Sequence, residues 1–439
     1  MSKKMPTLSE FLAMGYTPYH VVAEVREILE QNGYTELAEG ESWRLLPGGG
    51  YFFVRGGASL VAFRMPARTP RSYQLAIAHT DSPCFKIREA KADGEYIRLS
   101  VEKYGGMLCG TWFDRPLRVA GRVFVENGEK ILEKRVCLDG NLLIPSVAIH
   151  HNPSANEKLL ANVAVDLLPV FDQKKTALSF DEVLARAVGA ENAVVLGKDL
   201  FLVSDSTPFL WGEGETLISS PRLDDLQSVY ALLKGLLEAK DGGSVPVLAL
   251  LNGEEVGSLG VEGADSDILS VFVKRVADAS GKEADILPRL LASSFAISCD
   301  SAHAVHPAHP ELADGGEGRC YINEGIVIKE NAAKRYATDG FSEAMLRKLC
   351  QDASIPTQVY RNRADMPGGA TLGCIALSHI SVPMVDVGLA TLAMHSAMET
   401  AGTTDTAHLA HAAARYFSAT LIRDGESAFW QYEGEEQKK

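Results

Sequence analysis

Strand and helix patterns alternate along the second half of the chain, and no other feature of the sequence restricts the fold as strongly. Apolar runs typical of buried strands occupy residues 245–252 and 295–300. Patterns typical of amphipathic helices surround them, and we predict helices over residues 224–239, 267–280, 340–353 and 408–424. Strands that alternate with helices form a largely parallel sheet with helices packed on its faces. The sequence therefore predicts an α/β fold.

The first half of the chain has a different character. An amphipathic helix is predicted within residues 18–38, with Asn32-Gly33 as its stop signal, and a hairpin with a Gly-Gly turn follows over residues 48–65. Between residues 86 and 215, alternating segments and turn signals such as "ENGE" indicate a β-rich region. We predict one α/β domain built from residues 1–85 and 216–439, interrupted by a β-rich domain over residues 86–215. A chain of 439 residues is long enough for two domains.

Composition and charge argue against two classes of partner. With a net charge of -14 and a pI near 5.3, the chain is not expected to bind nucleic acid or an anionic membrane surface. No apolar run approaches the roughly 18 residues that a membrane-spanning helix needs, and the N-terminus is not typical of a signal peptide. The seven cysteines are scattered and never form a C-x-x-C pair, which is typical of free thiols in a reducing compartment. We therefore expect a cytoplasmic protein without nucleic-acid or membrane partners.

Polar residues with metal-binding side chains follow several of the predicted strands. Those just past the runs "LAIA", "VLALLNG" and "FAISC" are His79, Asp81, Glu254, Glu255 and Asp300. Asp224 in "SPRLDD" and His395 in "LAMHS" lie near predicted helix starts. Because the carboxyl ends of parallel strands meet at one edge of a sheet, we expect these side chains to lie close together. Histidines and carboxylates together suit zinc, with manganese or cobalt as alternatives.

The adjacent Glu254 and Glu255 need a physical explanation, because neighbouring carboxylates repel and are costly to desolvate. A metal bound by one of them would neutralise its charge, and the other would remain free to hold and deprotonate a water. Two cations that share a carboxylate would form a two-metal hydrolytic site. Spacing alone does not distinguish the roles of the two glutamates.

Each of these residues also has a simpler explanation. A histidine after a strand often serves only as a hydrogen-bonded core side chain, and adjacent glutamates often lie in a solvated loop. Asp224 at a helix start is favoured by the helix dipole alone. His79 and Asp81 make a stronger pair, because residues i and i+2 of an extended chain share a face and the carboxylate can orient the imidazole. The joint placement of the whole set favours a metal site.

Several long motifs in this sequence match one family. They include "AHTDSP", "VEKYGGMLCGTWFDRPLRVAGRV", "SPRLDDLQSVYALL", "NGEEVGS", "DSAHAVHP" and "LAMHSAMET", and they run nearly from end to end. On these motifs the chain resembles the aspartyl aminopeptidase family, whose relatives include vacuolar aminopeptidase I. The resemblance implies a zinc-exopeptidase-like, mostly parallel sheet flanked by helices, with an inserted β-rich dimerisation domain.

The resemblance also implies a dinuclear site with two Zn²⁺ ions per subunit, for which Co²⁺ or Mn²⁺ are alternatives. By motif, His79 and Asp300 would bind one ion, and Glu255 and His395 would bind the other. Asp224 would bridge the two ions. The activity implied is that of an exopeptidase that removes one residue from the N-terminus of a peptide.

Further roles follow from the resemblance alone. Glu254 would be the general base, and Asp81 would orient His79. His150 matches a family histidine that reaches the site of a neighbouring subunit, although its neighbour His151 is an equal candidate from sequence. Lys329 and Tyr336 fall in a segment that lines the substrate pocket of relatives; the lysine could pair with an acidic substrate side chain or be an exposed strand-end residue.

The expected function is a metalloaminopeptidase that prefers acidic N-terminal residues. Neutral or hydrophobic residues are the alternative preference, and a non-catalytic, peptide-binding scaffold is a third reading that the intact ligand set disfavours. The family implies dimers that assemble into a tetrahedral dodecamer. The loop at residues 364–373 departs from the family pattern, which leaves substrate selection open.

Overall fold

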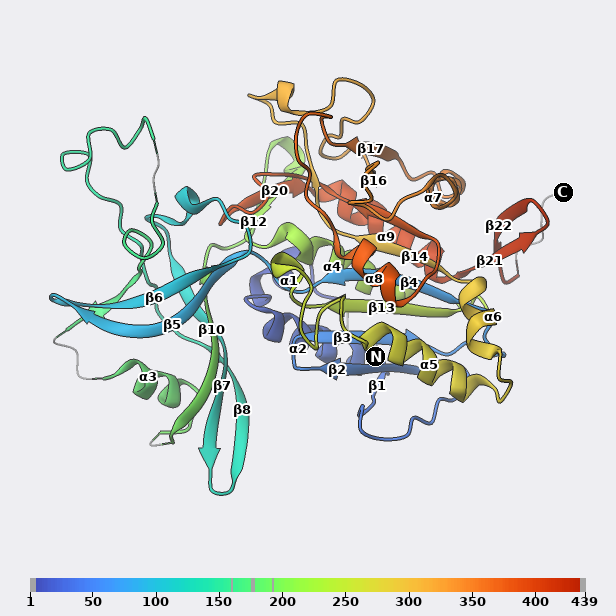
Figure 1. Cartoon of the computed structure of the whole chain (residues 1–439), viewed down its shortest axis with the longest axis horizontal. Helices are drawn as coiled ribbons and strands as arrows, with labels where there is room; N and C mark the ends of the chain where they lie inside the picture. The colour runs from blue at the N-terminus through green and yellow to red at the C-terminus, as the bar shows by residue number, and fades with distance from the viewer. Residues whose placement is uncertain (1–4, 159–160, 175–177, 192, 435–439) are drawn as a thin grey trace.

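The structure is a computed structural model, and it describes residues 5–158, 161–174, 178–191 and 193–434. Figure 1 shows two parts side by side, a helix-covered sheet on the right and a strand-rich part on the left. The C-terminal hairpin lies at the far right of this view. The two parts meet where the sequence-predicted metal ligands lie.

A nine-stranded sheet forms the body of the helix-covered part. In spatial order its strands are β1 (Thr35–Glu36), β2 (Gly50–Arg55), β3 (Ser59–Arg64), β13 (Val245–Leu251), β4 (Tyr73–His79), β14 (Phe295–Cys299), β18 (Met384–Gly388), β16 (Ile326–Glu330) and β17 (Thr357–Arg361). The four central strands, β13, β4, β14 and β18, run parallel to one another. The predicted mostly parallel sheet is therefore confirmed.

Helices cover both faces of this sheet. One face packs against α1 (Leu8–Met14), α2 (Pro18–Gln31), α4 (Leu223–Glu238), α7 (Gly340–Asp352) and α9 (Thr403–Phe417). The other packs against α5 (Ile268–Ser280), α6 (Ile286–Ala292) and α8 (Leu372–His379). Because both faces are covered, every residue of the four central strands is buried, which explains their continuous apolar sequences.

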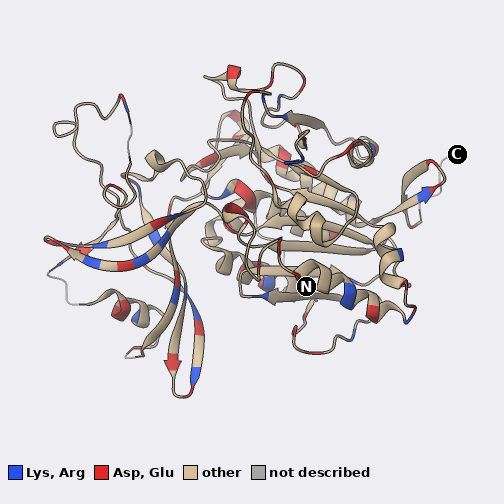
Figure 2. Cartoon of the chain, viewed as in Figure 1, with Lys and Arg blue, Asp and Glu red and all other residues tan. Residues whose placement is uncertain are grey.

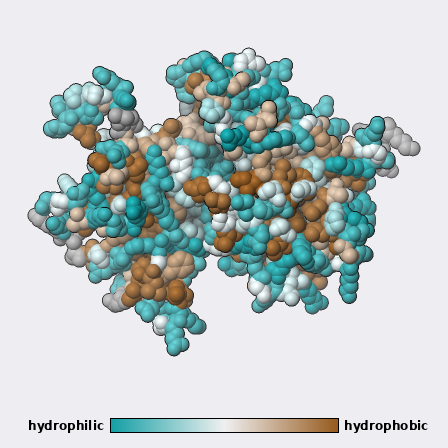
Figure 3. Space-filling view, in the orientation of Figure 1, coloured by the Kyte–Doolittle hydropathy of each residue, from teal (hydrophilic) through white to brown (hydrophobic). Residues whose placement is uncertain are grey.

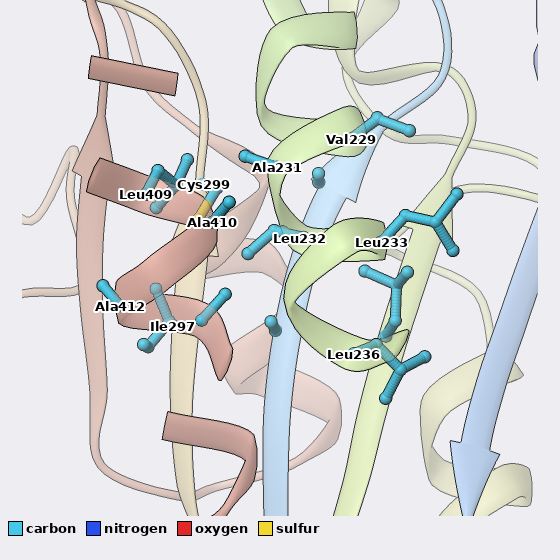
Figure 4. Close-up of a cluster of buried hydrophobic side chains, with 14 of the residues drawn as sticks. Val229, Ala231, Leu232, Leu233, Leu236, Ile297, Cys299, Leu409, Ala410 and Ala412 are labelled. Carbon is cyan, nitrogen blue, oxygen red and sulfur yellow. The ribbon is translucent and has the colours of Figure 1, made fainter. Parts of the chain in front are cut away.

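Within β13, alternate residues serve the two cores. Leu248 and Leu250 join the core beneath α4, whereas Val247 and Ala249 join the core beneath α5. The first of these cores is shown in Figure 4, where Leu232 of α4 points toward α9 and Leu233 and Leu236 lie on the other side of α4. A fully buried leucine contributes roughly 1.5–3 kcal/mol relative to an exposed one.

Close packing of α4 against α9 depends on a glycine. A Cβ at Gly235 would lie 2.4 Å from the Cβ of Ala413 and 2.9 Å from the backbone nitrogen of Ala414. Small residues on α9, such as Ala410 and Ala413, complete the close approach. The helix pair that carries Asp224 is therefore fixed by tight packing.

One predicted helix is partly wrong. The sequence predicts a helix over residues 408–424, but α9 ends at Phe417 and residues from Ala419 form β21 (Ala419–Asp424), paired with β22 (Ser427–Tyr432). Residues 419–421 are buried and residues 423–424 are exposed, so burial does not alternate along this segment, and pairing with β22 makes it a strand. A tight turn at Gly425, with φ of 58°, closes the hairpin.

The strand-rich part contains a six-stranded antiparallel sheet. In spatial order its strands are β8 (Lys130–Cys137), β7 (Leu117–Asn127), β10 (Val195–Ser204), β5 (Cys84–Asp93), β6 (Tyr96–Tyr104) and β9 (Val170–Gln173). With α3 (Phe180–Ala187) it encloses its own core, which includes Phe85, Val119 and Leu200. The sheet spans residues 84–204, which lie largely within the region predicted as β-rich.

A five-stranded sheet connects the two parts. In spatial order it comprises β11 (Phe209–Trp211), β12 (Leu217–Ser220), β20 (Glu399–Gly402), β19 (Ala390–Leu392) and β15 (Ala302–His303). The sequence did not predict it, because its strands are short and come from distant segments. None of the helices in the described ranges combines the length and the apolar character needed to cross a membrane.

Candidate metal centre

Three parallel strands deliver metal-binding side chains to one edge of the central sheet. His79 is the last residue of β4, and it pairs in register with Leu251, the last residue of β13. Asp300 follows β14 directly. After β13, Gly253 turns the chain with φ of 82°, and a short 3-10 helix, η3 (Glu254–Val256), presents the paired glutamates. The predicted convergence at the carboxyl ends of parallel strands is present in the structure.

His79, Asp224 and Asp300 form the first ligand group. Each offers one donor atom, and these atoms all lie within 4.8 Å of one another. The Nε2 atom of His79 lies 3.3 Å from Oδ1 of Asp224 and 3.6 Å from Oδ1 of Asp300. All three residues are buried.

Asp224, Glu255 and His395 form the second ligand group, again with donor atoms within 4.8 Å of one another. The Nε2 atom of His395 lies 3.4 Å from Oδ2 of Asp224 and 3.5 Å from Oε1 of Glu255. Asp224 thus directs one carboxylate oxygen toward each group. It lies at the start of α4, where its backbone has φ of -80° and ψ of 106°.

Several donor atoms in these groups are buried without a hydrogen-bond partner among the described residues. They are His79 Nε2, Asp224 Oδ1 and Glu255 Oε1. An unsatisfied buried polar atom costs about 1–3 kcal/mol, so three of them in one place are unusual in a folded protein. Cations bound in the two ligand groups would satisfy all three atoms, and the mixed nitrogen and oxygen donors suit zinc.

The ionisation of the site indicates a surplus of negative charge. Burial raises the pKa of Glu254 to about 8; His79 opposes this shift and Asp300 adds to it. Burial lowers the pKa of His395, but hydrogen bonding to Asp224 and the charge of Glu255 outweigh this and raise it to about 10. The pKa of Glu255 is also raised well above its ordinary value, by burial and then by Asp224. A site of this kind favours bound cations.

Asp81 lies behind both glutamates. Its Oδ1 accepts a hydrogen bond from the backbone nitrogen of Glu254, and its Oδ2 accepts one from that of Glu255, each at 3.1 Å. The hydroxyl of Tyr104 donates to the same Oδ2 at 2.9 Å. The Nδ1 atom of His79 lies 3.5 Å from the Asp81 carboxylate and 3.0 Å from the Asp81 backbone carbonyl. Asp81 therefore contacts both His79 and the glutamate loop.

Lys329 and Tyr336 lie next to the first ligand group. The Nζ atom of Lys329 is 3.3 Å from Oδ2 of Asp300 and 5.4 Å from the ring centre of Tyr336. Lys329 is only 3% exposed, so it is not the exposed strand-end residue that was one alternative. Burial lowers the pKa of this lysine, but Asp300 and Tyr336 raise it by a larger amount, so the net shift is upward. Its charge is thus already paired within the chain.

The sequence also indicates His150 and His151 as candidate site residues, and both lie away from the two ligand groups. Both are exposed, in a turn within the strand-rich part, and the His151 backbone nitrogen donates to the carbonyl of Ala148. Their predicted role requires a second subunit and stays a prediction.

Two residues of the site were missed by sequence reasoning. Tyr104 comes from β6, and Glu399 lies four positions after His395 at the start of β20. Glu399 accepts hydrogen bonds from the backbone nitrogens of Asp224 and His395. Its place within the "MHSAMET" motif was the one available signal.

The sequence model of the family described as "Aminopeptidase I zinc metalloprotease (M18)" matches residues 11–417. The chain belongs to the M18 family. A relative from Clostridium acetobutylicum, named "Probable M18 family aminopeptidase 2", is 37% identical over 410 residues, which cover 91% of this chain and 94% of the relative. The resemblance seen in the sequence is confirmed, and the chain is a metal-dependent M18 aminopeptidase.

Solved M18 structures share the fold. One described as "Cryo-EM structure of the Ape4 and Nbr1 complex" is 29% identical, with a TM-score of 0.88 over 93% of this chain and 84% of the other. The S. cerevisiae mApe1 dodecamer is 24% identical, with a TM-score of 0.81 over 93% of this chain and 95% of the other. At that identity the mApe1 match supports the M18 fold alone.

Proposed function

We propose that this M18 chain is a dinuclear aminopeptidase that cleaves one residue from the free N-terminus of a peptide and prefers an acidic first residue. The observation that carries the two-metal assignment is the geometry of Asp224, whose two carboxylate oxygens belong to different ligand groups. One ion would be held by His79 and Asp300, the other by Glu255 and His395. Zinc is the proposed metal, and cobalt or manganese are alternatives.

Bound ions in this position supply Lewis acidity, which lowers the pKa of a water and polarises the scissile carbonyl. Glu254 is the proposed general base. Its carboxylate lies within 4.8 Å of donor atoms of His79 and Glu255, close enough to take a proton at the ligand groups and pass it to the leaving amine. Asp81 would keep this loop in place through its hydrogen bonds to both glutamate backbones.

An adjacent pocket supports the preference for acidic residues. It is lined by residues 391–394, which lead to His395, and by five side chains with basic character: His303, His306, His309, Arg361 and Arg363. No acidic residue lies among its described lining, although the chain as a whole carries a net charge of -14. Arg361 and Arg363 each pair with a nearby carboxylate at 2.8 Å, so an incoming acidic side chain would share these cations with Glu330 and Asp365.

One observation favours the alternative preference for neutral or hydrophobic residues. The buried Lys329 already pairs with Asp300 at 3.3 Å, so its charge is partly used before a substrate arrives. If the enzyme prefers acidic residues, Lys329 and Tyr336 would line the substrate pocket. Lys329 would then contact Asp300 and the substrate at the same time.

Initial rates on aspartyl, glutamyl and leucyl anilides distinguish the two readings. We expect the acidic substrates to have the higher kcat/KM. Dominant turnover of the leucyl substrate would contradict the acidic preference without affecting the metal site. Elemental analysis of the same purified protein is expected to give two zinc ions per chain, and a single ion would contradict the dinuclear assignment.

We further propose that the β-rich region, predicted as a separate domain, mediates dimerisation and a tetrahedral dodecamer. Exposed apolar residues occur along it, including Ile131, Val165, Val194 and Leu196. Figure 3 shows hydrophobic surface over the lower left of the molecule, where Figure 1 has β7, β8 and α3. His150 would then reach a neighbouring site and stabilise the oxyanion. Light scattering should give the mass of a dodecamer; a stable monomer would contradict the assembly.

The proposed location is the cytoplasm. Each of the seven cysteines is free, as expected for a reducing compartment. Cell fractionation tests this location.

A further inference from the structure

We propose that Glu399 is a positioning residue for the second ligand group and acts mainly on the metal position formed by Asp224, Glu255 and His395. This inference rests on the two-metal site proposed above. It concerns a residue that binds neither metal nor substrate and acts through the backbones of two ligands.

The contacts of Glu399 are directed at that group. Its side chain is buried, with the residue 1% exposed. Oε2 accepts a hydrogen bond from the backbone nitrogen of Asp224 at 3.0 Å, and Oε1 accepts one from that of His395 at 2.7 Å. One carboxylate thus links two ligands that are separated by 171 positions, from 224 to 395, in the sequence.

Both backbones need this support. His395 has φ of 64°, in the left-handed region that residues with a side chain rarely adopt because it is sterically unfavourable. Asp224 has non-helical angles although it lies within α4, so the ordinary pattern of helical hydrogen bonds does not hold it. The hydrogen bond that Glu399 accepts from the His395 backbone offsets part of this cost.

The same device occurs at Asp81, whose two oxygens accept hydrogen bonds from the backbones of Glu254 and Glu255. Asp81 thereby holds the glutamate loop, and Glu399 holds the other two members of the second ligand group. Two of the three ligands in the second group depend directly on Glu399. In the first group only one ligand, Asp224, depends directly on Glu399. The backbone carbonyl of Asp224 also accepts a hydrogen bond from the Ser82 hydroxyl at 2.7 Å.

The test is a zinc titration of the metal-free full chain against a chromogenic chelator. Wild type should show two binding steps, and H395A should identify the step that belongs to the second ligand group. In E399Q an amide NH₂ faces one of the two backbone donors, and we expect that step to weaken by about 10- to 100-fold. The other step should change by less than about 3-fold, because only one of its three ligands, Asp224, contacts Glu399, and Ser82 also holds that residue.

Asp405 provides a matched control. It is fully buried, and its two oxygens accept hydrogen bonds from the backbone nitrogens of Asn323 and Gly325 at 2.7 and 2.8 Å. D405N makes the same chemical change at a carboxylate that holds two backbones outside the ligand groups. We expect D405N to lower Tm but to leave both zinc steps unchanged.

The outcomes separate the two proposals. If wild type binds fewer than two zinc ions, the two-metal function is wrong. If wild type binds two ions while E399Q weakens neither step, or weakens both steps equally, or if D405N produces the same selective loss, the positioning role is wrong. Should E399Q fail to fold, E399D keeps the charge but is too short to reach both backbones, and the same site-selective loss is expected in its titration.

Discussion

Removal of the metal ions should make the stability of this protein fall as the pH rises. In the metal-free site the pKa of Glu254 is raised from 4.5 to about 8, by burial and then by Asp300, with His79 opposing. Between these two pKa values, Glu254 keeps a proton in the folded state that it has lost in the unfolded state. The resulting stability is fully present below pH 4.5 and is lost as the pH rises through about 8. His395, raised from 6.5 to about 10, acts in the same direction over a higher range.

The magnitude follows from the size of these shifts. One pKa unit corresponds to about 1.4 kcal/mol. Between about pH 6 and about pH 8, Glu254 alone should therefore cost the metal-free protein roughly 2–3 kcal/mol. For a chain of 439 residues, with an unfolding entropy of about 2.1 cal/mol/K per residue, that is roughly 2–3 °C in Tm. Bound cations compensate the buried negative charge, so the loaded protein should show a much flatter dependence over the same range.

Differential scanning fluorimetry on chelator-treated and zinc-loaded protein measures this difference directly. The net negative charge of the chain lowers the stability of both forms as the pH rises. The informative quantity is therefore the difference in Tm between the two forms at each pH. Metal-free E254Q is the control, because it removes one titrating carboxylate and should reduce the slope. If the metal-free and loaded curves ran parallel, the idea of an uncompensated, cation-binding site would be refuted.

Three further predictions concern catalysis, assembly and packing. E254Q should lower kcat by about 10²- to 10⁴-fold while elemental analysis still finds the wild-type metal content; retained turnover would contradict the assignment of the base. In the assembled enzyme, H150A should lower kcat by about 10²- to 10³-fold with little change in Tm, whereas H151A should behave like wild type; equal effects would contradict the role of His150. G235V should lower the free energy of unfolding by about 1–3 kcal/mol, because its Cβ would lie 2.4 Å from that of Ala413, and an unchanged denaturation midpoint would contradict the tight packing of α4 on α9.

Much of the central sheet could be predicted because local pattern and tertiary role agree there. The apolar run that became β13 is buried on both faces, its neighbour β4 is parallel to it, and β14 is parallel to β4 on the far side. Parallel strands bring their carboxyl ends together, so His79, Glu254 and Asp300 could be placed near one another before the structure was seen. Strand order itself was not needed for that inference.

What could not be predicted depends on contacts between distant segments. Glu399 gives no local sign that it accepts a hydrogen bond from Asp224, 175 positions away. Tyr104 reaches Asp81 from a different sheet. The helix predicted to continue to residue 424 failed for a related reason, because residues 419–424 form a strand through pairing with β22. Taken alone, the sequence of residues 408–424 has the pattern of a helix.

The site lies where the two large sheets meet, and the strand-rich part contributes directly to it. Acidic positions, drawn red in Figure 2, gather at this junction. Tyr104 ends β6 and hydrogen-bonds Asp81, and the next residue, Gly105, approaches so closely that a Cβ there would lie 3.1 Å from the Cβ of Glu255. The backbone nitrogen of Leu108 donates to the carbonyl of His395 at 3.1 Å. Residues 104–108 therefore contact a glutamate and a histidine of the second ligand group. A shift of β6 against the central sheet would displace both, so the geometry of the metal centre depends on the strand-rich part as well as on the sheet that carries most of its ligands.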